Sequence, residues 1–380
     1  MYLIFIIFSL MKIKIFHTSD LHIGQKLLNL DNENLLYNAR FETLDKLIST
    51  ANDNDCGFFV VAGDLFNTLT VTKTEVSRVV NSLNNFSGEA VLVLPGNHDF
   101  YTTDNPKQLW MWFEDMINSN TVLLKTNKIY NFGMINFYPA HCTSKKSSNN
   151  NLDWIKNIQE YDNNAIHVGI AHGSLENVSP DMKGEYFPMK IKELDSAFID
   201  VWLLGHTHIP YPENNEQSRY YFAGTPEPDG FDCKHKGTAR IIEIDKNKNI
   251  KSEIIQTGKY YFLKKDHADI YNSNDIKSIE QEYTKKEYNN AFLRLNLSGS
   301  LTEKDYDLKF EIEKKINENV TFLDFIDNDL NKQISEQRIH DEFTKDSLPY
   351  KILMELENTG NNEALQIAFD LIQEVKRDNY

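Results

Sequence analysis

The chain has 380 residues, a net charge of −16, and apolar and charged fractions of 41% and 25%, which are ordinary for a soluble protein of two or three domains. The acidic excess covers the whole chain, with −7 on residues 1–259 and −9 on residues 260–380. No long basic stretch is present, which argues against tight non-specific DNA binding by this chain alone. The three cysteines follow no metal or redox spacing, as is typical of reduced thiols in a cytoplasmic protein.

The first ten residues are mostly apolar. No Lys or Arg precedes the apolar run, it is too short to span a bilayer, and no small-residue cleavage site follows it. We therefore expect residues 1–10 to be an extended start upstream of Met11, with a membrane tether as the alternative, and we expect no membrane-spanning segment.

From residue 11 to about residue 262, apolar strand-like runs alternate with amphipathic helices. Strands are expected at residues 13–16, 57–62, 90–94, 129–138, 166–171, 201–204, 220–223 and 239–244. Helices are expected at residues 38–51, 76–83 and 107–117, where apolar residues recur at helical spacing. The later strands follow one another closely, so we predict an α/β (α+β) fold with a two-layered β core and helices outside.

The pattern of predicted elements changes after Tyr261. A polar linker is expected at residues 266–277, followed by a strand at 289–297, a helix at 303–317 and a strand at 320–326. We therefore assign residues 11–262 to a first domain, residues 263–338 to a small α+β domain and residues 339–380 to C-terminal helices. The last helix carries an apolar stripe between Ala364 and Val375, which indicates either packing on its own chain or a partner-binding face.

Polar residues that can bind metal follow the strands of the first domain. Because open α/β sheets place their sites beyond the carboxyl ends of the strands, we expect these side chains to meet. Asp20 and His22 are two residues apart, as are His206 and His208, a spacing that sends both side chains of a pair to one side of an extended segment. The candidate metal ligands are Asp20, His22, Asp64, Asn97, His172, His206 and His208. Carboxylate, amide and imidazole ligands of this number are enough for two divalent ions, which predicts a metallohydrolase.

These motifs resemble the calcineurin-like metallophosphoesterase superfamily, and specifically its SbcD-type DNA-repair exonucleases. The resemblance rests on the segments Phe16–Gly24, Gly63–Phe66, Leu94–Asp99, Leu203–Pro210 and Ala223–Pro228. It implies the metallophosphoesterase β-sandwich for the first domain and a DNA-capping role for the second. It weakens beyond residue 265.

The resemblance implies two metal ions, most naturally Mn²⁺, although this ligand set also accepts Mg²⁺, Fe²⁺ or Zn²⁺. One ion would be held by Asp20, His22, Asp64 and His208, and the other by Asp64, Asn97, His172 and His206. The catalytic residues implied are His98, which would stabilise or protonate the leaving oxygen, and Asp99, which would orient the His98 imidazole. One position departs from the family pattern, since Asn67 stands where many relatives carry His or Asp.

The function predicted from this resemblance is a Mn-dependent DNA exonuclease and endonuclease that acts in double-strand-break repair. Its implied partners are DNA and an SMC-like ATPase of the SbcC type bound through the C-terminal helices, and a homodimer is compatible with the family. Two alternatives stay open. One is a phosphodiesterase for cyclic nucleotides or dinucleotide polyphosphates, and the other is a docking subunit of an ATPase complex with weak catalysis.

Overall fold

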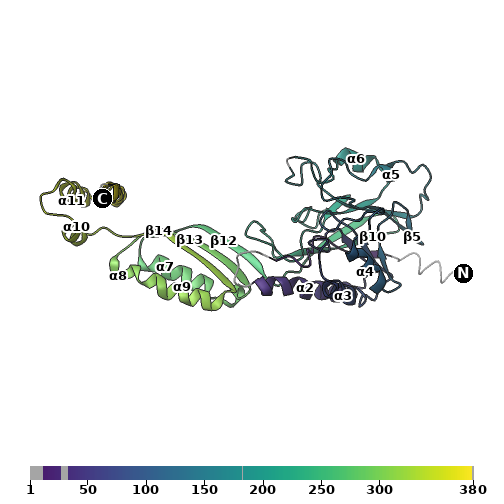
Figure 1. Ribbon diagram of the computed structural model, residues 1–380, viewed down its shortest axis with the longest axis horizontal. Helices are drawn as coiled ribbons and strands as arrows, with labels where there is room; N and C mark the ends of the chain where they lie inside the picture. Colours follow the sequence, from purple (N-terminus) through teal and green to yellow (C-terminus); the bar gives the residue numbers. More distant parts are fainter. Residues whose placement is uncertain (1–11, 27–32, 182, 379–380) are drawn as a thin grey trace. The chain divides into compact units, whose positions relative to one another are not determined.

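The computed structural model describes residues 12–26, 33–181 and 183–378 (Figure 1). The expectation for residues 1–10 lies outside these described residues. The chain divides into two compact units, Met1–Phe262 and Leu263–Tyr380, which are described separately below. No helix in the described part of the chain has the length and apolar character needed to cross a membrane.

The first unit is built on two β-sheets. The order of the six-stranded sheet is β11-β10-β1-β2-β3-β4, and the order of the five-stranded sheet is β5-β6-β7-β8-β9. Strands β1 to β4 run parallel, as do β6 to β9, whereas β10, β11 and β5 pair antiparallel with their neighbours. The strands are β1 Lys12–Thr18, β2 Phe58–Ala62, β3 Ala90–Leu94, β4 Thr121–Leu123, β5 Tyr130–Phe132, β6 Ile135–Ala140, β7 Ile166–His172, β8 Val201–Gly205, β9 Tyr220–Phe222, β10 Thr238–Asp245 and β11 Ile250–Gln256.

Alternation along the strands explains the layers of the first unit. In β2, Phe58 and Val60 contribute to the core between the two sheets, whereas Phe59 and Val61 pack beneath the helices. Because both faces of the strand are covered, its sequence is apolar throughout. The same strand therefore serves two hydrophobic cores, one on each face of the sheet.

Helices cover the outer faces of both sheets. The six-stranded sheet packs against α2 Glu33–Asp53, α3 Lys73–Leu83 and α4 Gln108–Met116, and the five-stranded sheet against the short helices α5 Asp153–Lys156 and α6 Ile191–Ser196. Helices α2 and α3 lie on the opposite side of this unit from α5 and α6 (Figure 1). The predicted α/β class with a two-layered β core and outer helices is confirmed. The strand expected at residues 129–138 is a hairpin of β5 and β6, because Gly133 turns the chain with a positive φ of 68°.

The second unit contains a three-stranded sheet in the order β12-β13-β14, with helices packed on one face (Figure 1). Three further helices form a separate small core around Leu353 and Phe369. The elements are β12 Tyr261–Ile270, α7 Ser273–Tyr283, a 3₁₀ turn Lys286–Tyr288, β13 Ala291–Leu301, α8 Glu303–Tyr306, α9 Leu308–Asn319, β14 Phe322–Lys332, α10 Glu336–Glu342, α11 Leu348–Asn358 and α12 Asn362–Asp378.

One expectation for this region needs correction, and the structure bears on a second. The polar linker predicted at residues 266–277 is in fact the end of β12 and the start of α7. The charged side chains at the end of β12 are exposed, and strand pairing through the backbone does not require apolar side chains. The stripe predicted on α12 divides in two, since Ala368 and Ile372 pack on the small core whereas Leu371 and Val375 are 55% and 60% exposed.

Candidate metal centre

All seven predicted ligand side chains meet at the carboxyl ends of the strands of both sheets. The six-stranded sheet supplies Asp20, His22, Asp64 and Asn97, which follow β1, β2 and β3, and the five-stranded sheet supplies His172, His206 and His208 from β7 and the loop after β8. Four of these residues have a positive φ although none is glycine: Asp20 at 55°, His22 at 48°, Asp64 at 52° and His206 at 97°. Left-handed backbone at non-glycine residues is costly, and it is typical of functional sites.

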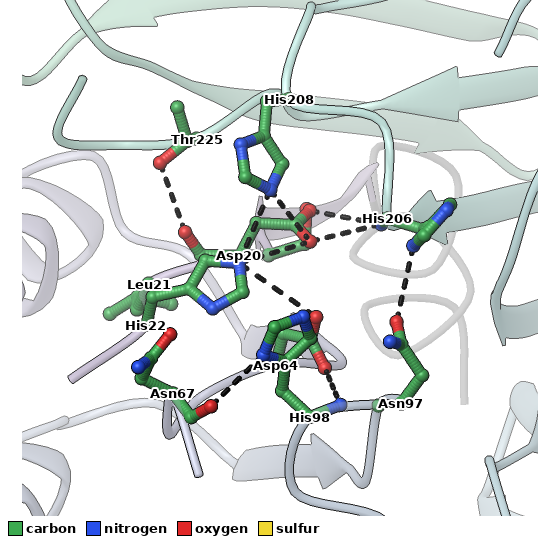
Figure 2. Close-up of polar contacts among 12 residues, drawn as sticks. Asp20, Leu21, His22, Asp64, Asn67, Asn97, His98, His206, His208 and Thr225 are labelled. Atoms are coloured by element: carbon green, nitrogen blue, oxygen red, sulfur yellow. Dashed lines mark hydrogen bonds and ion pairs between the residues drawn. The ribbon is translucent and has the colours of Figure 1, made fainter. Parts of the chain in front are cut away.

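The first group of ligand atoms surrounds Asp20. Nε2 of His22 lies 4.0 Å and Nε2 of His208 3.8 Å from Oδ1 of Asp20, and the two imidazole nitrogens are 3.2 Å apart (Figure 2). The Asp20 carboxylate is held by the Ser19 hydroxyl at 2.6 Å and by the backbone N–H of His206 at 3.0 Å. Burial raises the pKa of Asp20.

The second group surrounds Asn97. Its Oδ1 lies 3.0 Å from Nε2 of His172 and 3.1 Å from Nδ1 of His206. Asp64 belongs to both groups, since its Oδ2 is 3.3 Å from His172 and 3.8 Å from His22. The geometry thus places one carboxylate between two sets of nitrogen and oxygen ligands.

Electrostatics of the centre are dominated by the pairing of Asp64 with His172. Burial alone favours the neutral acid, but the charge and hydrogen bond of His172, and then the charge of His22, hold the pKa of Asp64 well below its usual range. Although burial opposes its protonation, Asp64 and then Asp20 raise the pKa of His172 to about 9. Burial and the charge of His172 lower the pKa of His206 to about 3. A divalent ion at this position would compete with the proton on His172, because a metal-ligating imidazole is neutral.

Three imidazoles are oriented by a contact on the ring nitrogen that faces away from the ligand groups. His172 donates from Nδ1 to the Ala62 carbonyl at 2.8 Å, and His208 Nδ1 lies 2.9 Å from Asp229. His98 donates from Nδ1 to the Asn67 carbonyl at 2.9 Å (Figure 2). Such outer contacts fix which nitrogen of a histidine carries its lone pair.

His98 lies beside the shared carboxylate. Its backbone N–H donates to Oδ1 of Asp64 at 2.8 Å, and its ring meets the His22 ring edge-on, with centroids 4.8 Å apart. The ring is only partly buried, and one of its nitrogens lies within 4.8 Å of ligand atoms of His22 and Asp64. His98 is therefore close enough to the centre to exchange a proton with a bound group.

The position of Asp99 differs from the expectation that it orients His98. Its two carboxylate oxygens accept backbone N–H bonds from Phe66 at 3.0 Å and from Gly96 at 2.7 Å. Asp99 thus ties the loop that carries Asp64 to the loop that carries Asn97, and the Asn67 carbonyl takes the role expected of Asp99. Burial, and then the charge of Asp64, raise the pKa of Asp99 to about 7.

A cavity of about 410 Å³ opens beside His206 and His208. Tyr186 and Asp229 line it, and the Tyr186 ring lies over His206 with centroids 5.0 Å apart. Sequence reasoning missed both residues, because neither stands in one of the five motif segments.

The donor set fits divalent metal ions. Three overlapping groups of His and Asp, each with ligand atoms within 4.8 Å of one another, lie in the described part of the chain: Asp20 with His22 and His208, His22 with Asp64 and His98, and Asp20 with Asp64 and His172. Nε2 of His22 and Nε2 of His208 face each other at 3.2 Å, an arrangement that a shared proton or a cation between them would satisfy. Buried carboxylates, imidazoles and an amide oxygen are ligands that such ions accept.

Comparison with known sequences identifies the family. The profile of the calcineurin-like phosphoesterases matches residues 13–210, which carry every predicted ligand. The chain belongs to this family. Its members are metallophosphoesterases, so the chain is a metal-dependent phosphoester hydrolase.

One relative of this calcineurin-like phosphoesterase is similar over nearly its whole length. The DNA double-strand break repair protein Mre11 of Sulfurisphaera tokodaii is 23% identical over 384 aligned positions, which cover 97% of this chain and 95% of the relative. Among solved structures, an archaeal phosphodiesterase is similar at 16% identity and a TM-score of 0.33, with 64% of this chain and 100% of that chain covered. TT1561 of Thermus thermophilus is similar at 9% identity and a TM-score of 0.37, with 64% and 99% covered.

Proposed function

We propose that this protein is a Mn²⁺-dependent DNA exonuclease and endonuclease with two metal ions, acting in double-strand-break repair. The observation that carries the proposal is the position of Asp64 between two ligand groups with His98 beside it. Similarity to an Mre11 protein over both units supports DNA as the substrate, because the metallophosphoesterase profile alone covers only the first unit.

In this proposal the ligand sets share Asp64. The first ion would be held by Asp20, His22, Asp64 and His208, and the second by Asp64, Asn97, His172 and His206. Bound divalent ions supply positive charge that attracts an anionic phosphodiester, and they promote the ionisation of water near neutral pH.

His98 is proposed as the general acid for the leaving oxygen. Its Nδ1 donates to the Asn67 carbonyl, so Nε2 is the atom that exchanges a proton with substrate. Asn67 serves through its backbone, and a carbonyl at this position orients the imidazole whatever the side chain is. Asp99 is proposed to act indirectly, because it fixes the spacing between the loop that carries Asp64 and the loop that carries Asn97.

The second unit is proposed to hold DNA and the partner. Residues 263–338 would cap the DNA, and residues 339–380 would bind an SMC-like ATPase of the SbcC type. Exposed apolar side chains on α11 and α12 support this role, with Leu348 at 72%, Ile367 at 54% and Leu371 at 55% exposure. Apolar helix faces of this kind bind partner helices in water. Sharing DNA with an ATPase would also compensate for the acidic charge of the chain.

Hydrolysis of labelled linear DNA with Mn²⁺, measured beside bis-(p-nitrophenyl) phosphate, tests the proposal. The variants are Asp64→Ala and His98→Ala, with His340→Ala as a histidine control on α10 of the second unit. We expect wild type and His340→Ala to degrade DNA and both site variants to fail.

Two results would redirect the assignment. If wild type cleaves the small diester but leaves DNA intact even with the ATPase partner added, the substrate is a small nucleotide. If Asp64→Ala retains full activity, the shared-carboxylate mechanism is wrong.

A further inference from the structure

The segment from Thr225 to His235 holds His208 at both its backbone and its side chain. The His208 carbonyl accepts the backbone N–H of Thr225 at 3.0 Å and Nε2–H of His235 at 2.7 Å. The imidazole Nδ1 lies 2.9 Å from a carboxylate oxygen of Asp229. One short segment outside the five ligand loops therefore fixes the position of this residue.

The contact between Asp229 and His208 determines which imidazole nitrogen carries the lone pair that can bind a metal. A carboxylate can only accept, so in the neutral imidazole it keeps the proton on Nδ1 and leaves the lone pair on Nε2. That Nε2 faces Asp20 at 3.8 Å and His22 at 3.2 Å. Without Asp229, an isolated neutral imidazole would populate both tautomers and would rotate about its side-chain bonds.

The surroundings make this contact more than a surface ion pair. The side chains of His208 and Asp229 are only 35% and 25% exposed, and the buried guanidinium of Arg40 interacts electrostatically with Asp229. Arg40 is itself fixed by donating to the Leu21 carbonyl at 2.7 Å, between two of the predicted ligands. Asp229 therefore contacts His208 directly and interacts with the charge of the buried Arg40 guanidinium.

We propose that Asp229 is a positioning residue that fixes the tautomer and orientation of His208 for metal binding. This proposal rests on the proposed function only in taking His208 as a ligand. Carboxylates that orient ligating histidines typically change metal affinity 10- to 100-fold when removed. Asp229 contacts the ring nitrogen of His208 that faces away from the two ligand groups.

The test compares Asp229→Ala and Asp229→Asn with Asp232→Ala. Asp232 lines the same cavity, three residues along the chain, and is exposed, so its removal changes the local charge equally without touching His208. Two quantities are measured: the tautomer of His208 in the metal-free protein by ¹⁵N NMR of labelled histidine, and the Mn²⁺ dissociation constant by calorimetry.

We expect the Asp229→Ala protein to show mixed tautomers at His208 and a 10- to 100-fold weaker site for Mn²⁺. Asp229→Asn should fall between this variant and wild type, because an amide oxygen still accepts from Nδ1 but carries no charge. Asp232→Ala should match wild type in both measurements. If Asp229→Ala does not fold, the Asn variant decides the question.

The proposal is overturned if the alanine variant, or the Asn variant in its place, keeps the wild-type tautomer and Mn²⁺ affinity, or if Asp232→Ala weakens the site equally. The outcome of the Asp229 experiment can be distinguished from the outcome of the nuclease assay. A wild-type protein that binds Mn²⁺ but does not cut DNA even with the ATPase partner present refutes the nuclease assignment and leaves the Asp229 result standing. The tautomer measurement needs neither metal nor substrate.

Discussion

Gly96→Ala tests whether the position of Asp64 controls activity. A Cβ at residue 96 would lie 2.2 Å from Oδ1 of Asp64 and 2.3 Å from its backbone nitrogen. Ordinary contact begins near 3.4 Å, so Asp64 must move by about 1.2 Å or Gly96 must retreat by as much. A misplacement of about 1 Å near the reacting atoms can cost on the order of 100-fold in rate, equivalent to about 2.7 kcal/mol. We therefore expect kcat/KM for bis-(p-nitrophenyl) phosphate with Mn²⁺ to fall at least about 100-fold.

Gly88→Ala is the matched control for this variant. Its Cβ would lie 2.5 Å from the Cys56 carbonyl oxygen and from the Phe86 ring, so it is similarly crowded. Gly88 precedes β3 and Gly96 follows it, which puts the two substitutions at opposite ends of one strand. Both should lower the free energy of unfolding by about 1–3 kcal/mol, the usual cost of overpacking. The reasoning is refuted if Gly96→Ala keeps activity within threefold of wild type, or if Gly88→Ala loses activity to the same extent.

Four further predictions concern the acid, the buried histidine, the metal and the tail. His98→Gln should lower kcat by about 10²- to 10⁴-fold, while the Mn²⁺ affinity measured by calorimetry stays within twofold of wild type. If the Mn²⁺ affinity falls in parallel, His98 is a metal ligand instead of a general acid. Burial, and then the charge of Arg240, lower the pKa of His17 to about 3 from 6.5, so the unfolded chain takes up the proton first as the pH falls. His17 should therefore lower the free energy of unfolding by about 2 kcal/mol between pH 7 and pH 5. Chemical denaturation of His17→Phe should show a smaller loss of stability over that range. An equal loss in the variant would contradict the lowered pKa of His17. Mn²⁺ at about 100 times its dissociation constant should stabilise the first unit by about 2.7 kcal/mol in thermal unfolding, a gain that a chelator reverses and that Asp64→Ala lacks. Leu371→Asp should abolish co-purification with the ATPase partner and leave turnover of the small diester unchanged, whereas retained binding would exclude this part of α12 as the docking face.

Sequence reasoning anticipated the strands and the loops that bring the predicted ligands together, because both leave local signals. The run from Phe58 to Ala62 is apolar at every position since both of its faces are covered, and Asp64 follows it within two residues. Residues that act across the fold leave no such signal. Asp229 is 21 positions from His208 in the sequence, and the Asn67 carbonyl acts through backbone that no side-chain pattern reveals.

The error at residues 266–277 has a similar cause. Strand β12 is charged along its middle from Lys264 to His267, because its backbone pairs with β13 while these side chains stay exposed. Composition predicts a linker there. The segment forms a strand because it pairs with β13, about 30 residues further along the chain. Long-range pairing is therefore the part of this fold that local patterns could not supply.

The division of the predicted ligands between two sheets has a consequence for stability. Asp20, Asp64 and Asn97 belong to one layer of the sandwich, and His172 and His206 belong to the other. A cation held by both sets would cross-link the two layers of the sandwich. Metal binding would then stabilise the packing of the two sheets against each other at the edge where the strands end. Amide hydrogen exchange in β3 and β8, which lie in different layers, should slow together when metal is added.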